Sequence, residues 1–264
     1  MQFFCYHNKQ YIPQIAASIL ISDLGFTRGY AAFELIRTYN FTPFYLKEHL
    51  ERFKKNACTL RLEYPNNVEE VIHTLLEKNK QKNLVIRLYL SEDESGKSHF
   101  LVLCDPINTP TKDQYDNGIA VITTHHMRHF YQIKSTCYLA AILALKDAAN
   151  QNAEDAIFTN PQGHLLELTK SNFFAVIDGT LYTPKNEILI GITRSIVIDR
   201  AMELSIPLKE ESISLSQLPY IEEAFSTSTI REILPISKID TQIIPLGPIT
   251  KTLQLIFHKQ EILL

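Results

Sequence analysis

The order of short and long apolar segments constrains the fold of this chain most strongly. Short runs typical of strands alternate irregularly with longer amphipathic runs typical of helices. Strict strand–helix–strand alternation would favour a doubly wound parallel sheet, and it is missing here, so we expect an α+β fold. The stretch "DPINTPTKDQYDNG" is rich in Pro, Asp and Asn and has little to bury. We therefore expect a small N-terminal α/β domain at residues 1–108, a linker at 109–118 and a larger domain at 119–264.

The first half is expected to contain a sheet and two helices. The strings "AAFELIRTYN" and "FYL" predict two strands joined by the short turn "FTP". Apolar residues at helical spacing predict an amphipathic helix at residues 46–61, and "VEEVIHTLLEKNK" predicts a second helix. The strings "LVIRLYL" and "HFLVLC" predict further strands on either side of the polar loop "SEDESGKS".

The second half has its own pattern of strands and helices. "IAVITT" predicts a strand, and residues 136–150 predict a helix. "DAIFT", "HLLEL" and "NFFAVI" predict strands separated by turns, and "IDGTLYTP" contains an Asp-Gly turn. "GITRSIVIDRAMELS" predicts a helix with Thr193 as its N-cap. "EEAFSTST" predicts another strand, and "ITKTLQLIFHKQEIL" predicts a closing helix.

Composition limits the possible partners and the cellular compartment. The net charge is -3, so no basic field favours nucleic acid or an anionic membrane. No apolar stretch is long enough to span a bilayer, and "MQFFCYHNKQ" lacks the pattern of a signal peptide. The 4 cysteines are far apart and form no C-x-x-C pair, which indicates reduced thiols in a cytoplasmic protein. His125, His126 and His129 have no acidic or cysteine ligand nearby, so we expect no metal site.

One lysine stands in an unusual place, in "YQIKSTCYLAA". Lys134 follows an apolar stretch and precedes Ser135 and Thr136, which are typical of a helix start. Its stem could pack on the core while its ammonium reaches water. Alternatively, its amine could carry out covalent chemistry. The residues around Lys134 leave both interpretations open.

Other polar residues also allow two interpretations. The turn "GITR" at the start of a helix suits an anion site, with the Thr193 hydroxyl as an added donor, but it also suits a simple N-cap. Glu167 faces away from its flanking leucines, toward either solvent or a cationic partner. Arg87, within an apolar strand, faces either solvent or a carboxylate ligand. Arg52 lies off the apolar face of its helix and is, on its own, a solvated charge.

Taken in order, these pieces resemble a known family. Lys134 is followed 33 positions later by Glu167 in "LLELTKSNFF", and then by "LYTP", "ILIGITR" and "STSTIREILPI". This order is similar to that of the class IV aminotransferases, which are pyridoxal-phosphate (PLP) enzymes of fold type IV. The family includes branched-chain aminotransferases, D-amino-acid aminotransferases and aminodeoxychorismate lyase. The stretch "SDLGFTRGYAAFELIRTYNFTPFYLKEHLERF" resembles the family's D-R-G-F…G-x-x-F-E-x-I-R…H-x-x-R-L segment, so the resemblance covers nearly the whole chain.

The resemblance implies roles for individual residues around the cofactor. Lys134 is implied to hold PLP as a Schiff base and, once released, to move a proton between the substrate Cα and C4′. Glu167 is implied to face the pyridine nitrogen and to favour its protonated form. The remaining implied cofactor contacts are Arg52, Ile192, Thr193, Ser228 and Thr229 around the phosphate, Tyr138 at the phenolic oxygen and Leu189 against one ring face.

The substrate side departs from the common family pattern. Where the family often reads F-G-D-G-V-F-E, this chain reads "RGYAAFE", so Arg28 replaces an aromatic residue of the substrate site. Arg87 matches the arginine of the branched-chain enzymes' Y-I-R motif, and Phe33 is a further implied substrate contact. Two such arginines resemble an atypical group of D-amino-acid aminotransferases, and they suit a substrate with two carboxylates such as glutamate or 2-oxoglutarate. Alternatively, one arginine pairs with a neighbouring acid such as Glu34.

The resemblance implies transfer of an amino group between an amino acid, D- or branched-chain, and a 2-oxo acid, by a cytoplasmic homodimer. The alternative within the family is 4-amino-4-deoxychorismate lyase, which makes 4-aminobenzoate and pyruvate. Lyases often carry Asn-Ser or Asn-Ala where this chain has Ser228-Thr229, and Thr at position 34. Outside these activities, a non-catalytic binding protein and a metal hydrolase built on the histidines are the other classes. Intact Lys134 and Glu167 argue against the binding protein.

Overall fold

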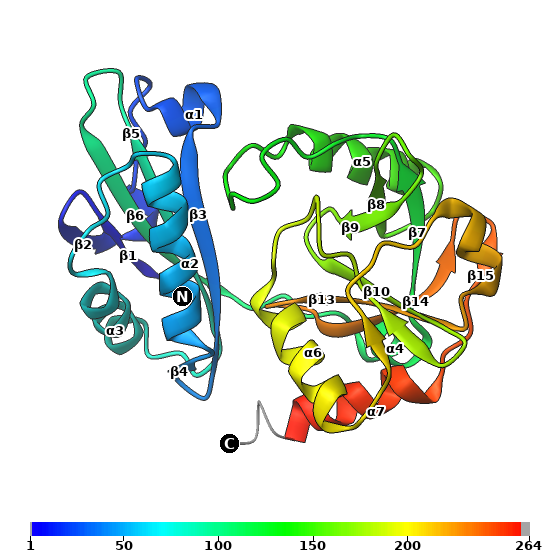
Figure 1. Ribbon diagram of the computed structural model, residues 1–264. Helices are drawn as coiled ribbons and strands as arrows, with labels where there is room; N and C mark the ends of the chain where they lie inside the picture. The colour runs from blue at the N-terminus through cyan, green and yellow to red at the C-terminus, as the bar shows by residue number, and fades with distance from the viewer. Residues whose placement is uncertain (1, 260–264) are drawn as a thin grey trace. The chain divides into compact units, whose positions relative to one another are not determined.

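The chain divides into two compact units (Figure 1). The computed structural model describes residues 2–259. The first unit comprises Met1–Asn108 together with Ile133–Tyr138, and the second comprises Thr109–Gln132 together with Leu139–Leu264. The short segment 133–138, which contains Lys134, therefore belongs with the N-terminal unit although its flanking residues belong with the other.

The first unit is built on a sheet with the strand order β2-β1-β6-β5-β3-β4. Neighbouring strands along this order are antiparallel. The strands are β1 (Phe4–His7), β2 (Gln10–Pro13), β3 (Ala31–Tyr39), β4 (Thr42–Pro43), β5 (Leu84–Glu92) and β6 (Ser98–Pro106). The helices are the one-turn η1 (Gln14–Ala16), α1 (Leu24–Arg28), α2 (Leu46–Thr59) and α3 (Val68–Asn79).

Helices α2 and α3 pack on one face of this sheet (Figure 1). Their apolar sides meet alternate residues of the strands, and Ile36, Phe53, Ile72 and Leu88 are fully buried there. Because side chains alternate along a strand, the residues between the core positions lie on the opposite face. That opposite face carries Phe33 from β3 and its cross-strand neighbour Tyr89, and Arg87 opposite Leu35.

The segment around Lys134 extends the first sheet along β3. The Phe33 N–H donates to the Lys134 carbonyl at 2.9 Å, and the Thr136 N–H donates to the Ala31 carbonyl at 3.1 Å. An antiparallel bridge joins Ala32 to Ser135. The prediction of a helix from residue 136 is therefore wrong at its start, because the backbone of residues 134–136 is already bonded to β3. The helix, α5, spans Leu139–Asn150.

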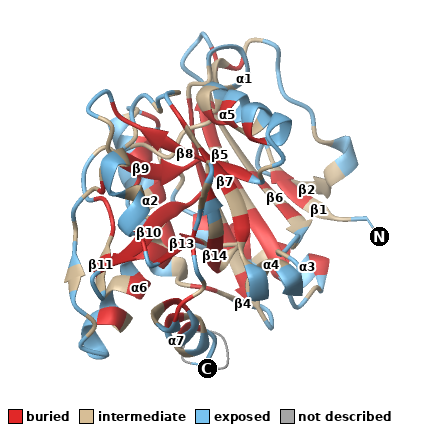
Figure 2. Ribbon diagram, turned by 90° about the vertical axis from the view of Figure 1, so that its right-hand side faces the viewer, coloured by how far each residue is buried: buried red, intermediate tan, exposed pale blue. Residues whose placement is uncertain are grey.

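The second unit is a sheet that closes on itself. The strand order is β12-β11-β10-β13-β14-β7-β8-β9, and β9 also pairs with β10. The strands β10, β13, β14, β7, β8 and β9 thus form a ring, and apolar residues from all of them fill one core that includes Val121, Ile157, Phe173 and Leu234. Figure 2 shows these strands largely in the buried class. The strands are β7 (Ile119–Thr124), β8 (Asp155–Thr159), β9 (Leu165–Leu168), β10 (Asn172–Ile177), β11 (Thr180–Tyr182), β12 (Leu208–Lys209), β13 (Glu223–Ser228), β14 (Glu232–Ile239) and β15 (Gln242–Ile243).

Helices and turns of the second unit correct several predictions. Its helices are α4 (Lys112–Asn117), α5, α6 (Ile192–Glu203), the short η2 (Leu215–Tyr220) and α7 (Pro248–Phe257). The expected linker at 109–118 contains α4, which a Thr111–Gln114 capping box begins. The predicted closing helix ends at Phe257, and the part of that prediction at residues 260–263 lies outside the described residues. The Asp-Gly turn is confirmed, with φ of 49° at Asp178 and 65° at Gly179.

Two local predictions fail for identifiable reasons. The expected strand "FYL" is a turn, because Tyr45 takes a φ of 47° and α2 begins at Leu46. The N-cap of α6 is Gly191, with no side-chain cap, whereas Thr193 lies inside the first turn and is buried.

The structure bears on two predictions made from composition, those on membrane-spanning segments and on cysteines. Over residues 2–259, no helix combines the length and the apolar character needed to cross a membrane. All 4 cysteines are free thiols, Cys5 and Cys104 buried and Cys58 and Cys137 exposed.

Candidate active site

In the first unit, the predicted lysine lies against an aromatic ring. The Nζ of Lys134 is 4.5 Å from the centroid of the Phe33 ring, a cation–π arrangement. Tyr138 meets the same ring edge-on at 5.6 Å, and Tyr89 stacks on it at 6.2 Å between centroids. Lys134 is thus joined by its backbone to β3 and lies against the predicted substrate contact Phe33, whose ring the predicted cofactor contact Tyr138 also meets.

Arg52 is part of a buried charge cluster and not a solvated charge. Its Nε and Nη2 donate to the two carboxylate oxygens of Glu34 at 2.8 and 2.7 Å. His49, one helical turn earlier on α2, places Nδ1 3.2 Å from the same carboxylate. Burial alone raises the pKa of Glu34, but the charge of Arg52 and the hydrogen bonds from both partners outweigh it and hold that pKa well below its usual range. Burial lowers the pKa of His49.

The two arginines predicted to bind substrate differ in their surroundings. Arg87 lies on the sheet face opposite the helices, and its Nε is 3.4 Å from Asp105. Arg28 ends α1, is exposed and donates to the Thr27 carbonyl at 3.0 Å. The alternative that one of these arginines pairs with a neighbouring acid therefore holds for Arg87, but the acid is Asp105. Glu34, the expected example, points toward the helices and pairs with Arg52.

In the second unit, Glu167 is buried and surrounded by donors. The Arg128 Nη1 donates to its Oε1 at 3.2 Å, and the Leu189 N–H donates to its Oε2 at 3.1 Å. The Asn172 amide reaches the same Oε2 at 3.5 Å and the Leu189 carbonyl at 2.6 Å. Sequence reasoning missed both Arg128 and Asn172. A cation within the loop after β7 was the only available signal for Arg128.

The start of α6 is held close to this carboxylate. A Cβ on Gly191 would come within 2.1 Å of the Asn172 Oδ1, so only glycine fits against that side chain. The Glu167 carboxylate accepts from the Leu189 N–H, and the Asn172 amide contacts both Glu167 and Leu189. Gly191 lies two residues after Leu189 and is the N-cap of α6. Glu167, Leu189, Ile192 and Thr193, all predicted cofactor contacts, therefore belong to one continuous part of the second unit.

The strand β13 ends in the hydroxyl-rich sequence that contains the other predicted phosphate contacts. Ser226 Oγ and Thr227 Oγ1 are buried and make no hydrogen bond among residues 2–259. Ser228 Oγ accepts from the Arg231 N–H at 3.2 Å, and Thr229 lies in the turn between them. The Ser226 and Thr227 hydroxyls point to opposite faces of the strand, so at most one of them can meet a phosphorylated ligand together with the N-terminus of α6.

The histidines do not assemble into a cluster. His125 Nδ1 is 3.1 Å from the Thr159 hydroxyl, and His126 Nε2 is 3.0 Å from Asp147. In the described part of the chain, no group of three or more His, Cys, Asp or Glu side chains could hold a metal ion.

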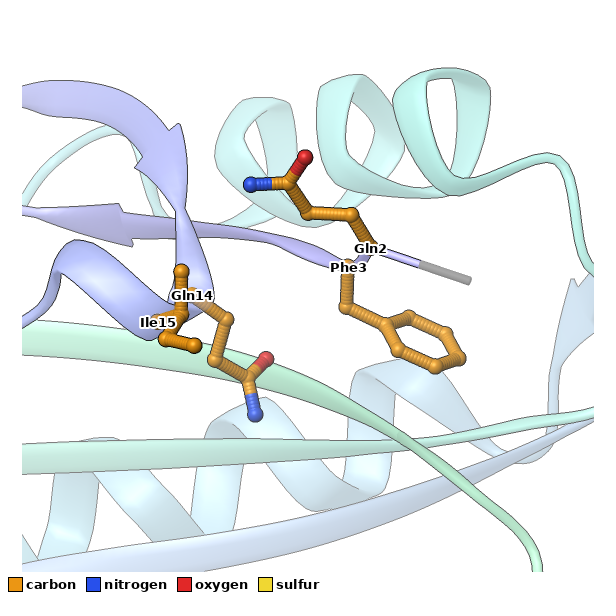
Figure 3. Close-up of a pocket in the computed structure, with 4 residues that line it drawn as sticks. All are labelled: Gln2, Phe3, Gln14 and Ile15. Carbon is orange, nitrogen blue, oxygen red and sulfur yellow. The ribbon is translucent and has the colours of Figure 1, made fainter.

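A hollow in the first unit lies apart from these residues. It is lined by Gln2, Phe3, Gln14 and Ile15 (Figure 3). Ile15 is 89% exposed, so the hollow is open to solvent. It contains none of the predicted catalytic, cofactor or substrate residues.

Comparison with known proteins shows which family this chain resembles. The family model of class IV aminotransferases matches residues 31–239. A Methanocaldococcus jannaschii protein, provisionally named as a branched-chain-amino-acid aminotransferase, is 33% identical over 94% of this chain and 93% of its own length. The D-alanine aminotransferase of Staphylococcus haemolyticus is 31% identical over 96% of this chain and 95% of its own length. The branched-chain aminotransferase of Thermoproteus uzoniensis, solved with norvaline, superposes with a TM-score of 0.90 at 27% identity, covering 98% of this chain and 94% of that one.

These findings define first a fold and then a family. The fold is that of the PLP enzymes of fold type IV. The chain belongs to the class IV aminotransferase family, which uses PLP, and its curated relatives are named as aminotransferases. A Legionella pneumophila structure, provisionally named as a 4-amino-4-deoxychorismate lyase, shares the fold, with a TM-score of 0.84 at 24% identity.

Proposed function

We propose that this chain moves an amino group between an amino acid and a 2-oxo acid, with PLP bound covalently to Lys134. The observation that carries the proposal is the ordered pair of Lys134, packed on Phe33, and Glu167, buried and held by Arg128 and Leu189, in a chain of this family. PLP, when bound, supplies an electron sink for the substrate carbanion. With PLP bound, Lys134 would hold the cofactor and its amine would accept and return a proton at the substrate Cα, and the Glu167 carboxylate would favour the protonated form of the pyridine nitrogen.

The remaining predicted contacts divide between anchoring and orientation. A dianionic phosphate needs charge and N–H donors, and the family resemblance implies these roles for Arg52 of the first unit and for the first turn of α6 of the second. Arg52 is already oriented by its bidentate bond to Glu34, so its position on α2 is fixed before any ligand binds. The proposed phosphate and ring contacts are Arg52, Ile192, Thr193, Ser228, Thr229, Tyr138 and Leu189.

The covalent role of Lys134 is tested by reduction and peptide mapping. Borohydride treatment of the full-length protein should add the reduced cofactor mass to the peptide that contains Lys134. Lys134→Ala should lose that mass and all turnover while unfolding at a similar temperature. Lys170→Ala is a matched control on an exposed lysine of the same chain and should change neither. Cofactor mass on another peptide, or on none, would refute the proposal.

For the substrate, we propose a dicarboxylate such as glutamate with 2-oxoglutarate as its oxo acid. Arg87 lies on the same sheet face as Phe33, against whose ring Lys134 packs, and Arg28 is an exposed guanidinium at the end of α1. A charged hydrogen bond from such a group to a carboxylate contributes about 1.5–3 kcal/mol. The D-alanine aminotransferase relatives and the branched-chain neighbour support amino-acid donors of either hand.

Substitution of Arg28 tests which carboxylate of the substrate this arginine binds. We expect Arg28→Gln to lower kcat/KM for glutamate far more than for alanine. Equal losses for both substrates would place Arg28 on the shared α-carboxylate, and no loss would remove it from the site.

A panel of D- and L-amino acids with aminodeoxychorismate, followed by cofactor absorbance, decides between transamination and the lyase reaction. Glu34, buried beside Arg52 where lyases often carry Thr, supports transamination.

We also propose that the enzyme is a homodimer in the cytoplasm. Large apolar side chains are exposed along residues 15–26 of the first unit, which is typical of a surface covered by another chain. The free thiols support a reducing compartment. Sedimentation of the active enzyme tests the dimer, and a fully active monomer would contradict it.

A further inference from the structure

An arginine closes the turn at the end of β13. Arg231 lies between β13 and β14, and its Nη1 is 2.6 Å from the Oδ2 of Asp155 at the start of β8. Its N–H donates to Ser228 Oγ at 3.2 Å, and its carbonyl accepts from the Tyr115 hydroxyl of α4 at 3.2 Å. The side chain and both backbone groups of Arg231 are therefore each bonded to a different residue.

Asp155, the acidic partner of Arg231 in this ion pair, is completely buried. Besides Arg231, Asp155 accepts from the Thr169 hydroxyl at 2.5 Å, from the Thr169 N–H at 3.3 Å and from the Ala156 N–H at 2.9 Å. Thr169 follows directly after β9, the strand that carries Glu167. One carboxylate thus joins the end of the strand that carries Glu167 to the turn that contains Ser228 and Thr229.

A buried ion pair of this kind contributes more to geometry than to stability. Removing two charges from water costs several kcal/mol, which hydrogen bonds and mutual attraction largely offset. An apolar pair would serve equally well for stability, but it would leave the turn free to shift. Next to that turn, Ser226 and Thr227 keep buried hydroxyls with no hydrogen bond among the described residues.

We propose that the Asp155–Arg231 pair positions the Ser228–Thr229 turn for the phosphate of the cofactor. The inference rests on the proposed function, because it takes the phosphate role of this turn from there. Asp155 and Arg231 act through the turn and are positioning residues. Their loss should therefore weaken recognition of the phosphate specifically, beyond any loss of stability.

The test compares two ligands that cannot bind a lysine covalently. Pyridoxine 5′-phosphate and pyridoxine differ only in the phosphate, and their dissociation constants are measured on the full-length chain after removal of its cofactor. Arg231→Met and Asp155→Asn should each weaken pyridoxine 5′-phosphate by about tenfold or more, corresponding to loss of a well-oriented charged contact. The dissociation constant of pyridoxine should change little in these variants. Arg231→Lys should bind pyridoxine 5′-phosphate more tightly than Arg231→Met does, because it keeps the charge.

Controls separate this role from a structural one. Arg200→Met removes an ion pair with Glu203 on α6, away from the turn, and should leave the ratio of the two dissociation constants unchanged. If Arg231→Met does not fold, Tyr115→Phe, which removes the hydroxyl bond to the Arg231 carbonyl, should still raise the dissociation constant of pyridoxine 5′-phosphate more than that of pyridoxine. An equal loss for both ligands, or no loss, would overturn the inference. A wild-type chain that binds both ligands equally would instead overturn the proposed phosphate site itself.

Discussion

Three buried carboxylates of this chain are each matched by an arginine. Glu34 pairs with Arg52, Glu167 with Arg128, and Asp155 with Arg231. The partners lie 18, 39 and 76 residues apart in sequence. Burying a carboxylate without a partner is very costly, so each arginine makes its acid possible at that place. The free energy of these pairs is expected to be small, and their main consequence is orientation.

The charge of Glu167 is expected to matter for chemistry more than for binding. Glu167→Gln keeps nearly the same shape and can still accept from the Leu189 N–H, but it loses the negative charge that we propose favours the protonated pyridine nitrogen. The half-reaction with an amino acid should slow by more than about tenfold, or about 1.4 kcal/mol of barrier. Cofactor affinity, measured by equilibrium dialysis, should change far less. Stopped-flow absorbance that shows the wild-type rate would remove Glu167 from this role.

His49 should make stability depend on pH. Because burial lowers its pKa below the ordinary 6.5, the unfolded chain binds a proton as the pH falls through that value while the folded protein does not. Stability therefore decreases as the pH falls from about 7 toward the folded pKa, with a slope of up to about 1.4 kcal/mol per pH unit. The lowered pKa of Glu34 acts in the same direction, but only below its ordinary value of 4.5.

Urea unfolding of the wild type and of His49→Gln checks this prediction between about pH 7 and pH 5.5. The glutamine can still donate to Glu34 but cannot titrate. The free energy of unfolding should fall less with pH in His49→Gln than in the wild type. Identical slopes would show that His49 does not contribute.

At the scale of elements, the approach of α6 to β10 depends on one glycine. A methyl group at Gly191 would overlap the Asn172 Oδ1, although the φ of -81° at Gly191 suits any residue. Gly191→Ala should destabilise the protein by about 1–3 kcal/mol and displace the Asn172 amide from Leu189 and Glu167. Weaker cofactor binding should follow.

A second substitution shows whether the overlap is the cause. In an Asn172→Ser background the shorter side chain leaves room for the methyl group, so Gly191→Ala should cost much less in thermal unfolding there. Equal costs in both backgrounds would indicate that the change acts through the helix cap and not through Asn172.

Elements with a clear apolar period could be predicted from the sequence, and their ends often could not. The spacing of Leu46, Leu50 and Phe53 predicted α2, which ends at Thr59 and not at residue 61. The Asp178–Gly179 turn was predictable because both residues tolerate a positive φ. The apolar "FYL" was misread as a strand because apolar character alone does not reveal a positive φ at Tyr45.

The candidate site was predictable as a set of residues, through the family resemblance, but not as a set of contacts. Lys134, Glu167 and Thr193 could be named from motifs, whereas the local sequence suggested that Lys134 opens a helix. The bond from Phe33 to Lys134 joins residues about a hundred positions apart, and no local pattern encodes it. Arg128 was missed for the same reason, since nothing in its loop indicates a bond to Glu167.

For the whole molecule, the assignment of residues 133–138 to the first unit is testable by hydrogen exchange. The Thr136 amide is bonded to the Ala31 carbonyl, so its exchange should follow the stability of the first sheet. Ile72→Val and Ile157→Val are matched changes at fully buried positions of the first and second unit. Each should cost about 0.5–1.5 kcal/mol. Exchange at Thr136 should speed up in Ile72→Val and stay unchanged in Ile157→Val; the reverse result would assign the segment to the second unit.

The ring of strands in the second unit also sets the order in which a growing chain can fold. β7 pairs with β8 on one side and with β14 on the other, and the Thr123 N–H bonds to Asp240, 117 residues later. During translation, β14 leaves the ribosome long after β7, so β7 must wait with one side unpaired. β3 waits for almost as many residues before positions 134–136 are made, but these positions emerge well before β14 does. The N-terminal unit can therefore complete its sheet before β14 is made, whereas the ring cannot close until β14 has emerged, and in that interval the nascent chain is most in need of chaperones.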